Sequence, residues 1–285
     1  MERDPTDRFE ADRDHLRAVA YRMLGDRDEA DDALQETWLR ARRAGLDAVE
    51  NPTGWLTTVT GRVCLDMLRA RRARPVPSPE GVEAPDAVEP EAEAVLAESV
   101  GRALLVVLDR LSPAQRVAFV LHDLFAVPFD EIAATVDRSV PATKKLASRA
   151  RERVRGGTVA DPARHGEHRR IVEAFLAASR GGDIDALLRL LAPDVVRRVD
   201  RFAAPSAAAE VRGASAVAGE TRAFAARART GAVALVDGAP GIVLAPRGRL
   251  SVVIRVRVDG GRISEVEVIG DPARLARTGV AVGPA

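Results

Sequence analysis

The sequence predicts a multidomain chain with two all-helical domains in its first half and a C-terminal α+β domain. Three observations support this fold class. Apolar residues recur at helical spacing up to about residue 155, a proline-rich acidic segment interrupts them, and strand-like alternation follows residue 196. A length of 285 residues suits two or three compact units. The predicted boundaries are 1–74 and 100–155 for the helical domains, 75–99 for a linker, 156–167 for a hinge and 168–280 for the α+β domain.

The first domain is predicted to contain three helices. Gly25 is a C-cap for the first, and the second, about Asp28–Arg43, starts with carboxylates and ends with arginines, as the helix dipole favours. The third begins at Asn51-Pro52, an N-cap residue followed by proline.

Two charged faces stand out in this domain. A polar face on the second helix lies away from its apolar side, and arginines stand on the third helix and its basic end. The first set is Asp32, Gln35 and Glu36; the second is Arg62, Arg69 and Arg72. A protein partner on the acidic face and nucleic acid on the basic one is one interpretation. Helix-dipole complementarity without a partner is the other, and both stay open at this point.

The segment from Pro75 to Ser99 combines prolines with Glu and Asp and holds no basic residue. It cannot bury enough apolar area to fold alone, so we expect a flexible acidic linker. A helix is then expected from about Glu93. Its apolar residues are expected to pack under the next motif: Val100, Leu104, Val107, Leu108 and Leu111.

A helix-turn-helix motif is predicted after this helix. Ser112-Pro113 starts a helix, a short second helix follows, and a turn at Asp137-Arg138 leads to a third, basic helix. The N-terminal end of that third helix would meet base edges, and residues further along would meet phosphates. The candidate DNA contacts are Thr143, Lys144, Lys145 and Arg149. The alternative is an ordinary solvated basic helix face.

The α+β domain starts with a helix pair over Arg169–Leu191, and a further helix lies near Ala214–Ala228. The strand candidates are Ala232–Val236, Gly241–Ala245, Leu250–Val258 and Ile263–Ile269. They are expected to form an antiparallel sheet.

Charges predict the register of the last two strands. Arg257 should face Glu265, and Arg255 should face Glu267, which leaves valines opposite each other on the other face. That register predicts a three-residue connection at Gly260–Arg262 with a glycine at positive φ, because a two-residue turn would set aliphatic residues against glutamates.

Several function classes are disfavoured by composition. No apolar run approaches the roughly 20 residues of a membrane helix, and the first residues do not resemble a signal peptide. The single cysteine, Cys64, excludes an internal disulfide framework and a Cys-rich zinc site, and the four histidines lack metal-ligand spacing. We therefore expect a cytoplasmic protein with no metal, no cofactor and no membrane partner.

Three stretches together carry a family resemblance: DRDEADDALQETWLRA (Asp26–Ala41), NPTGWLTTVTGRVCLDMLRARRAR (Asn51–Arg74) and the helix-turn-helix segment Leu111–Arg155. They resemble regions 2.2, 2.3–2.4 and 4 of the bacterial extracytoplasmic-function sigma factors. The resemblance implies two all-α sigma domains that bind core RNA polymerase and promoter DNA, and an initiation factor that reads −10 and −35 elements.

Residue roles follow from this resemblance. It implies polymerase-clamp contacts for Asp32, Gln35 and Glu36, and −10 contacts for Arg62, Arg69 and Arg72. It implies −35 contacts for Thr143, Lys144, Lys145 and Arg149. The loop over Ala44–Glu50 would capture a flipped −10 base.

The C-terminal segment resembles the SnoaL-like branch of the nuclear-transport-factor-2 (NTF2-like) superfamily, which sigma factors of the SigJ type carry at this place. The stretches Leu235–Leu250 and Asp271–Leu275 carry that resemblance. It implies an α+β cone that contacts the sigma domains within the same chain and tunes their activity.

The preferred function is therefore an alternative sigma factor regulated by its own C-terminal domain. One alternative is a helix-turn-helix transcriptional regulator with a ligand-sensing NTF2-like domain. An enzyme is disfavoured and no catalytic residue is predicted, because the expected inward strand positions are all aliphatic: Ile254, Val256, Val258, Val266 and Val268. The only polar candidates near the cone mouth are Asp194, Arg198 and Asp200. Whether the cone binds a small molecule is left open.

Overall fold

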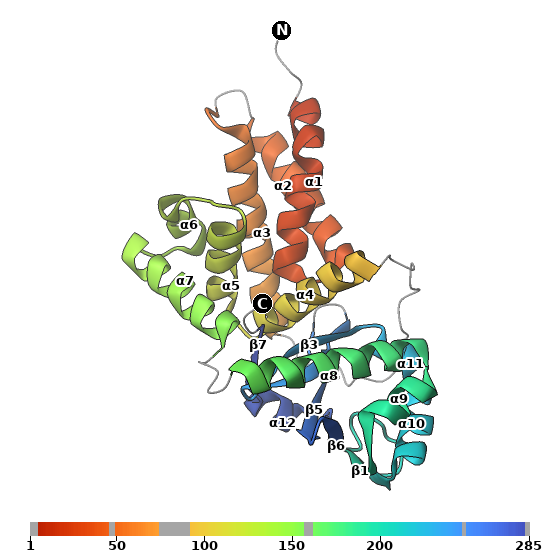
Figure 1. The fold of residues 1–285 in the computed structure, drawn as a ribbon. Coiled ribbons are helices and arrows are strands. Elements are labelled where there is room, and N and C mark those ends of the chain that lie inside the picture. The colour runs from red at the N-terminus through yellow and green to blue at the C-terminus, as the bar shows by residue number, and fades with distance from the viewer. Residues whose placement is uncertain (1–4, 46–48, 74–91, 157–161, 247–248, 283–285) are drawn as a thin grey trace. The chain divides into compact units, whose positions relative to one another are not determined.

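A computed structural model describes residues 5–45, 49–73, 92–156, 162–246 and 249–282 (Figure 1). The chain divides into two compact units. The helical unit contains α1–α3 together with α5, η1, α6 and α7 as far as Glu152. The sheet unit contains α4 as far as Val107 and everything described from Arg153 onward.

The first three helices confirm the predicted caps. They are α1 (Pro5–Leu24), α2 (Arg27–Ala44) and α3 (Pro52–Ala73). Gly25 adopts φ 80° and its N–H donates to the Tyr21 carbonyl at 2.8 Å, which closes α1. The Asn51 side chain accepts from the Gly54 N–H at 3.0 Å and starts α3. Part of the loop between α2 and α3, residues 46–48, lies outside the described residues, as does the linker over 74–91.

The helix-turn-helix motif is also confirmed. It comprises α5 (Pro113–Phe119), the π-helical turn η1 (Val120–Leu124), α6 (Phe129–Val136) and α7 (Val140–Arg155). Ser112 and Gln115 form a capping box at the start of α5. The π turn shifts the helical phase, and Leu124 at its end is 39% exposed.

The turn between α6 and α7 depends on Asp137, which adopts the left-handed φ of 58° and donates its N–H to the Ala133 carbonyl. The first turn of α7 then begins after Ser139, whose side chain accepts from the Ala142 N–H. The buried stripe of α7 is Thr143, Ala147 and Ala150. Thr143, which was predicted to contact DNA, therefore belongs to the buried side of α7.

The sheet unit begins with two helices, α8 and α9, that precede its first strand. Its helices after α4 are α8 (Pro162–Gly181), α9 (Ile184–Leu190), α10 (Ala214–Ala223), α11 (Ala225–Ala228) and α12 (Pro272–Arg277). The strands are β1 (Leu191–Val199), β2 (Glu210–Arg212), β3 (Gly231–Val236), β4 (Ala239–Leu244), β5 (Val252–Asp259), β6 (Arg262–Ile269) and β7 (Val280–Ala281). The start of α8 at Pro162 makes part of the expected hinge helical.

The strands of the described chain form one sheet in the order β2-β1-β6-β5-β4-β3-β7. All neighbours pair antiparallel except β1 and β6, which are parallel. The expectation of a purely antiparallel sheet was therefore wrong at this pair. The strand β1 was not assigned from the sequence, and it reaches β6 through a long connection, which parallel pairing requires.

The predicted β5–β6 register is confirmed, with Arg257 opposite Glu265 and Arg255 opposite Glu267. The predicted three-residue connection is wrong. Asp259 pairs with Arg262 across a two-residue turn of Gly260 and Gly261, with φ 56° and 76°. Opposite the step from Arg257 to Val258, β6 contains one extra residue in a bulge. The bulge keeps the valines of the two strands on the same face of the sheet.

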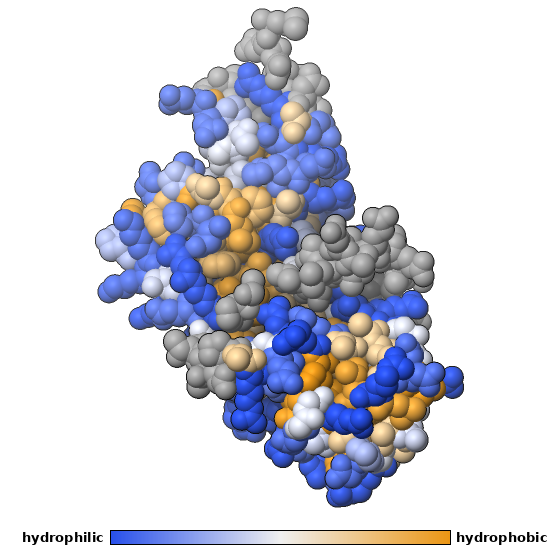
Figure 2. Space-filling view, in the orientation of Figure 1, coloured by the Kyte–Doolittle hydropathy of each residue, from blue (hydrophilic) through white to orange (hydrophobic). Residues whose placement is uncertain are grey.

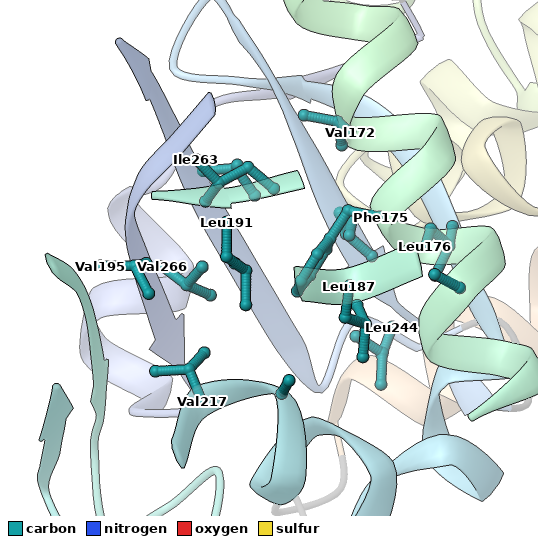
Figure 3. Packing of buried hydrophobic residues seen from close by; sticks show 14 residues of the cluster. Val172, Phe175, Leu176, Leu187, Leu191, Val195, Val217, Leu244, Ile263 and Val266 are labelled. Carbon is teal, nitrogen blue, oxygen red and sulfur yellow. The ribbon is translucent and has the colours of Figure 1, made fainter. Parts of the chain in front are cut away.

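Each face of the sheet has its own apolar cluster. Figure 3 shows the first, in which Phe175 and Leu176 of α8 pack with Leu187, Leu244 and Val266. The second joins strand residues to α4 (Ala92–Asp109): Ala103, Val106 and Val107 pack with Ala232, Ala234, Val236, Val243, Val253 and Ile269.

This second cluster corrects one expectation. Val107, assigned to the support of the helix-turn-helix, instead covers the sheet. Leu108 and Leu111 are buried and belong to the helical unit, and the side chain of Val100 lies outside the described part of α4.

Candidate nucleic-acid and protein interfaces

The exposed face of α7 carries three of the four predicted −35 residues: Lys144, Lys145 and Arg149. The surface over α7 is largely hydrophilic in Figure 2. The Lys144 Nζ lies 5.8 Å from the centre of the Phe129 ring on α6, a cation–π distance that holds this lysine near the first turn. Arg151, by contrast, pairs with Asp123 at 2.5 Å, so its charge is already balanced.

Thr143 is a correction. Its side chain is fully buried and its Oγ1 donates to the Ser139 carbonyl at 3.0 Å. A base edge cannot reach a side chain in that position. Thr143 therefore fixes the start of α7, and the polar surface that can meet DNA begins at Lys144.

The three arginines of α3 do not form one open surface. The Arg62 Nη1 donates to the Thr135 carbonyl at 2.8 Å, at the C-terminal end of α6, where unpaired carbonyls and the helix dipole attract a cation. The Arg72 Nη2 donates to the Leu111 carbonyl at 3.3 Å. Arg69 and Arg72 are exposed and Arg62 is half-buried, and Arg69 lies 3.9 Å from Asp66.

Close packing of α3 on the helix-turn-helix explains these contacts. A Cβ added at Gly61 would lie 2.9 Å from the Leu121 side chain, so a larger residue there would require that side chain to move. Thr58 Oγ1 donates to Glu131 on α6 at 3.2 Å. The two helical domains predicted from the sequence thus form one compact unit.

Arg116 of α5 lies inside that unit and was not found from the sequence, which shows only a charged residue within an apolar helix. It is 2% exposed, and its Nε and Nη2 have no hydrogen-bond partner among the residues that the structure describes. Its nearest carboxylate is Asp109 at 3.7 Å. Burial lowers the pKa of Arg116 from its ordinary 12.5 to about 10, although Asp109 acts in the opposite direction.

A groove of about 460 Å³, lined by three carboxylates and two arginines, lies between α1 and α2. Phe9 and Trp38 line it, with their ring centres 5.2 Å apart. Asp32 and Gln35, two of the three predicted clamp residues, line it as well. Glu36 is not among the lining residues and pairs with Arg40 at 2.9 Å.

Charge pairing also shapes the rim of this groove. Arg17 of α1 contacts Asp31 of α2 at 2.6 Å. The hydrogen bond from Arg17 lowers the pKa of the Asp31 carboxyl, so it stays ionised. Asp32 makes no such ion pair within the described ranges of the helical unit, so it is the exposed carboxylate best placed to meet a cationic partner.

The remaining polar candidates have structural roles. Asp200 accepts hydrogen bonds from the backbone N–H groups of Phe202, Ala203, Gly270 and Asp271. Burial alone would raise the pKa of Asp200, but these four donors outweigh it and the pKa is lowered. Arg198 pairs with Glu210 and Glu265. Burial raises the pKa of Cys64 to about 12, which keeps this thiol protonated.

Within the described ranges, no cluster of three or more His, Cys, Asp or Glu side chains is arranged to hold a metal ion. None of the described helices combines the length and apolarity needed to cross a membrane.

Comparison with protein families gives two matches, one on either side of residues 75–99. Residues 8–74 match Sigma-70 region 2, and residues 101–154 match Sigma-70, region 4. The chain is 32% identical over 274 residues to a probable ECF RNA polymerase sigma factor SigI of Mycobacterium tuberculosis (strain H37Rv). That alignment covers 94% of this chain and 93% of the relative.

A second relative from the same strain, the ECF RNA polymerase sigma factor SigJ, is 42% identical over 224 residues. The alignment covers 73% of this chain and 69% of the relative. Among solved structures, the crystal structure of Mycobacterium tuberculosis SigJ aligns with 98% of this chain and 99% of its own, at 35% identity and a TM-score of 0.44.

Proposed function

This chain belongs to the extracytoplasmic-function sigma factors, and from that membership we propose a role for each of its charged surfaces. It is an alternative sigma factor that binds core RNA polymerase and directs transcription initiation at promoters. The observation that supports the residue roles best is that the exposed face of α7 is cationic, whereas a separate groove between α1 and α2 presents the exposed carboxylate of Asp32. One face suits DNA and the other suits a protein.

The functional division is proposed as 1–74 for region 2, 75–99 for the linker, 100–155 for region 4, 156–167 for the hinge and 168–280 for the regulatory domain. The packing of α4 on the sheet supports one refinement. The region 4 match begins inside α4, at residue 101, whereas α4 as far as Val107 packs in the sheet unit, so this helix is proposed to belong to both functional parts.

Lys144, Lys145 and Arg149 are proposed to bind the −35 element. In holoenzyme, Lys144→Ala or Lys145→Ala is expected to weaken promoter binding about tenfold and to lower the salt slope by about 1, because a cation–phosphate or cation–base contact is lost. Thr143→Val is the matched control and should leave affinity unchanged, because its buried hydroxyl meets only Ser139. Equal losses for Thr143→Val and Lys144→Ala would contradict the assignment of the exposed face.

The polar face of α2, which includes one wall of the groove, is proposed to bind the polymerase clamp through Asp32, Gln35 and Glu36. Reversal of both charges, Asp32→Lys with Glu36→Lys, is expected to reduce run-off transcription by at least about 100-fold, because like charges at an interface cost several kcal/mol. Purified core polymerase and promoters drawn from a genomic template pool provide the assay.

The control for that experiment is Asp14→Lys, an exposed charge reversal on α1 that does not line the groove. It should retain transcription. Normal initiation by the double variant, with its fold verified by circular dichroism, would refute the clamp assignment.

Arg62, Arg69 and Arg72 are proposed to bind the −10 element after the helical unit opens. Their −10 role requires free guanidinium groups, whereas two of them donate to carbonyls at α6 and Leu111 in the compact unit. Polymerase and DNA would therefore have to replace these contacts. The loop over Ala44–Glu50 is proposed to capture a flipped base in the same step.

The C-terminal domain is proposed to regulate the sigma domains of its own chain through α4, and to have no catalytic activity. The sigma factor family is not an enzyme family, and Arg198 and Asp200, two of the polar candidates at the cone mouth, are held in structural bonds. The chain is proposed to act in the cytoplasm, where core polymerase works.

A further inference from the structure

A cavity of about 110 Å³ lies between the sheet and the helices that cover it. Its walls are apolar side chains of α8 and of the central strands, including Phe175, Leu176, Ile242 and Ile254. The valines predicted to point inward on β6, Val266 and Val268, also line it. Its volume approaches that of engineered apolar cavities that admit benzene, so it suits a single ring of about six to eight non-hydrogen atoms.

One end of the cavity is polar and contains Arg197 and Glu220, which sequence reasoning missed. A third charged lining residue, Arg227, is exposed to solvent, and its Nη1 donates to the Ala203 carbonyl at 3.0 Å. Arg197 of β1 is 7% exposed and Glu220 comes from α10. The Arg197 Nη2 pairs with the Glu220 carboxylate, and its Nη1 donates to the Ala208 carbonyl at 2.7 Å. Burial lowers the pKa of Arg197. The sequence does not show which residues of β1 point into the cavity, because β1 is placed there by parallel pairing with β6, a strand distant in the chain.

The ion pair restricts the charge of any occupant. Arg197 and Glu220 neutralise each other, so an anion would have to displace Glu220 and a cation would have to displace Arg197. Either exchange leaves a charged side chain without its partner in a mostly apolar site, which is unfavourable. A neutral occupant leaves the pair intact.

Two hydroxyl groups offer a hydrogen bond to an occupant of the cavity. Ser179 Oγ donates to the Phe175 carbonyl at 2.6 Å, and Thr221 Oγ1 donates to the Val217 carbonyl at 2.7 Å. Each hydroxyl has one hydrogen, so both can only accept from a ligand. Both residues line the cavity. The matching ligand group is therefore a hydrogen-bond donor, and a ring is favoured because Phe175 and Phe224 line the same space.

From this arrangement we propose that the sheet unit binds a small neutral ring compound that carries one hydroxyl group. The ring occupies the space between α8 and the strands, and the hydroxyl donates to Thr221 or Ser179. This site lies wholly within the sheet unit. The proposal is independent of how the charged surfaces of the helical unit bind DNA or polymerase.

The test uses the full-length chain without polymerase, titrated with phenol in a calorimeter. Saturable binding with a dissociation constant on the order of 1 mM or tighter is expected for so small a ligand. Toluene, which lacks the donor, should bind about fivefold more weakly, and benzoate and benzylammonium at least about tenfold more weakly. No saturable phenol binding, or tighter binding of benzoate than of phenol, would overturn the proposal.

Two variants locate the site. Ala204→Leu fills the cavity and should abolish phenol binding. Thr221→Val keeps the shape but removes the acceptor, and should reduce the preference for phenol over toluene to about equal binding. Thr278→Val is the matched control, since Thr278 also donates to the carbonyl four residues back but does not line the cavity. Unchanged phenol binding in a folded Ala204→Leu variant would place the phenol elsewhere and overturn the proposal.

Discussion

Val106→Asp is expected to lower the free energy of unfolding of the sheet unit by about 3 kcal/mol or more, because it places a carboxylate in an apolar cluster. Val106 of α4 is 1% exposed and packs against the sheet, in the cluster that contains Val243 and Val253. After the substitution, either α4 detaches from the sheet or the new carboxylate stays buried, and both outcomes lower the free energy of unfolding. Thermal and urea unfolding of the full-length chain measure the loss.

The same variant tests the proposed regulatory connection. If α4 transmits the effect of the C-terminal domain, Val106→Asp should change run-off transcription, and Val106→Ala should change it in the same direction by less. A point substitution is preferable to a chain that ends after α7, because truncation would expose the apolar side of α4 with its residues Ala103, Val106 and Val107.

Leu124→Asp provides the stability control for this experiment. Leu124 is 39% exposed, so a carboxylate there should alter the free energy of unfolding by no more than about 0.5 kcal/mol. If Val106→Asp were equally mild and transcription were unaltered, α4 would not be a structural part of the sheet unit in solution.

Arg116→Met is expected to stabilise the helical unit by about 1–4 kcal/mol and to reduce transcription. A pKa of about 10 in the folded protein, against an ordinary 12.5, disfavours the charged form by about 3 kcal/mol. Methionine fills a similar volume with no unpaired donors. Asp109, the remaining partner, is partly exposed and keeps its solvation. A more stable compact unit opens less readily, so Arg62 and Arg72 become available to DNA less often.

The sign of the pH dependence follows from the same pKa. Between about pH 10 and 12.5 the unfolded chain binds more protons at this position than the folded chain, so the contribution of Arg116 to stability rises with pH. Arg116→Met should remove that rise. Arg189→Met, at an exposed arginine on α9, should leave stability and transcription unchanged. If the Arg116→Met variant unfolded more easily than the parent chain, the Arg116–Asp109 pair would be net stabilising.

Much of the local structure was predictable because it depends on neighbouring residues. The caps at Gly25, Asn51 and Ser112 require only short-range hydrogen bonds, and the structure contains each of them. The β5–β6 register was predictable from cross-strand charges. The bulge was not, because a two-residue glycine turn and an extra residue in β6 give the same register as a three-residue loop.

The interfaces were predictable only in outline. Lys144 and Lys145 are exposed as expected, whereas the packing of α7 buries the neighbouring Thr143. The sequence identifies Arg62 and Arg72 as cations but does not reveal their bonds to carbonyl groups distant in the chain. The Arg197–Glu220 pair was missed for the same reason, since it joins a strand to a later helix.

The sequence by itself therefore determined the family, the order of the helical and α+β parts, and the residues that can carry charge to DNA or polymerase. These properties depend on composition, periodicity and local caps, which act over a few residues. Only the tertiary structure decided that α4 covers the sheet, that α3 is packed against the helix-turn-helix and that a cavity remains beneath α8. Each of these depends on which apolar surfaces meet, and that choice is made by shape and volume across the whole fold rather than by neighbours in the chain.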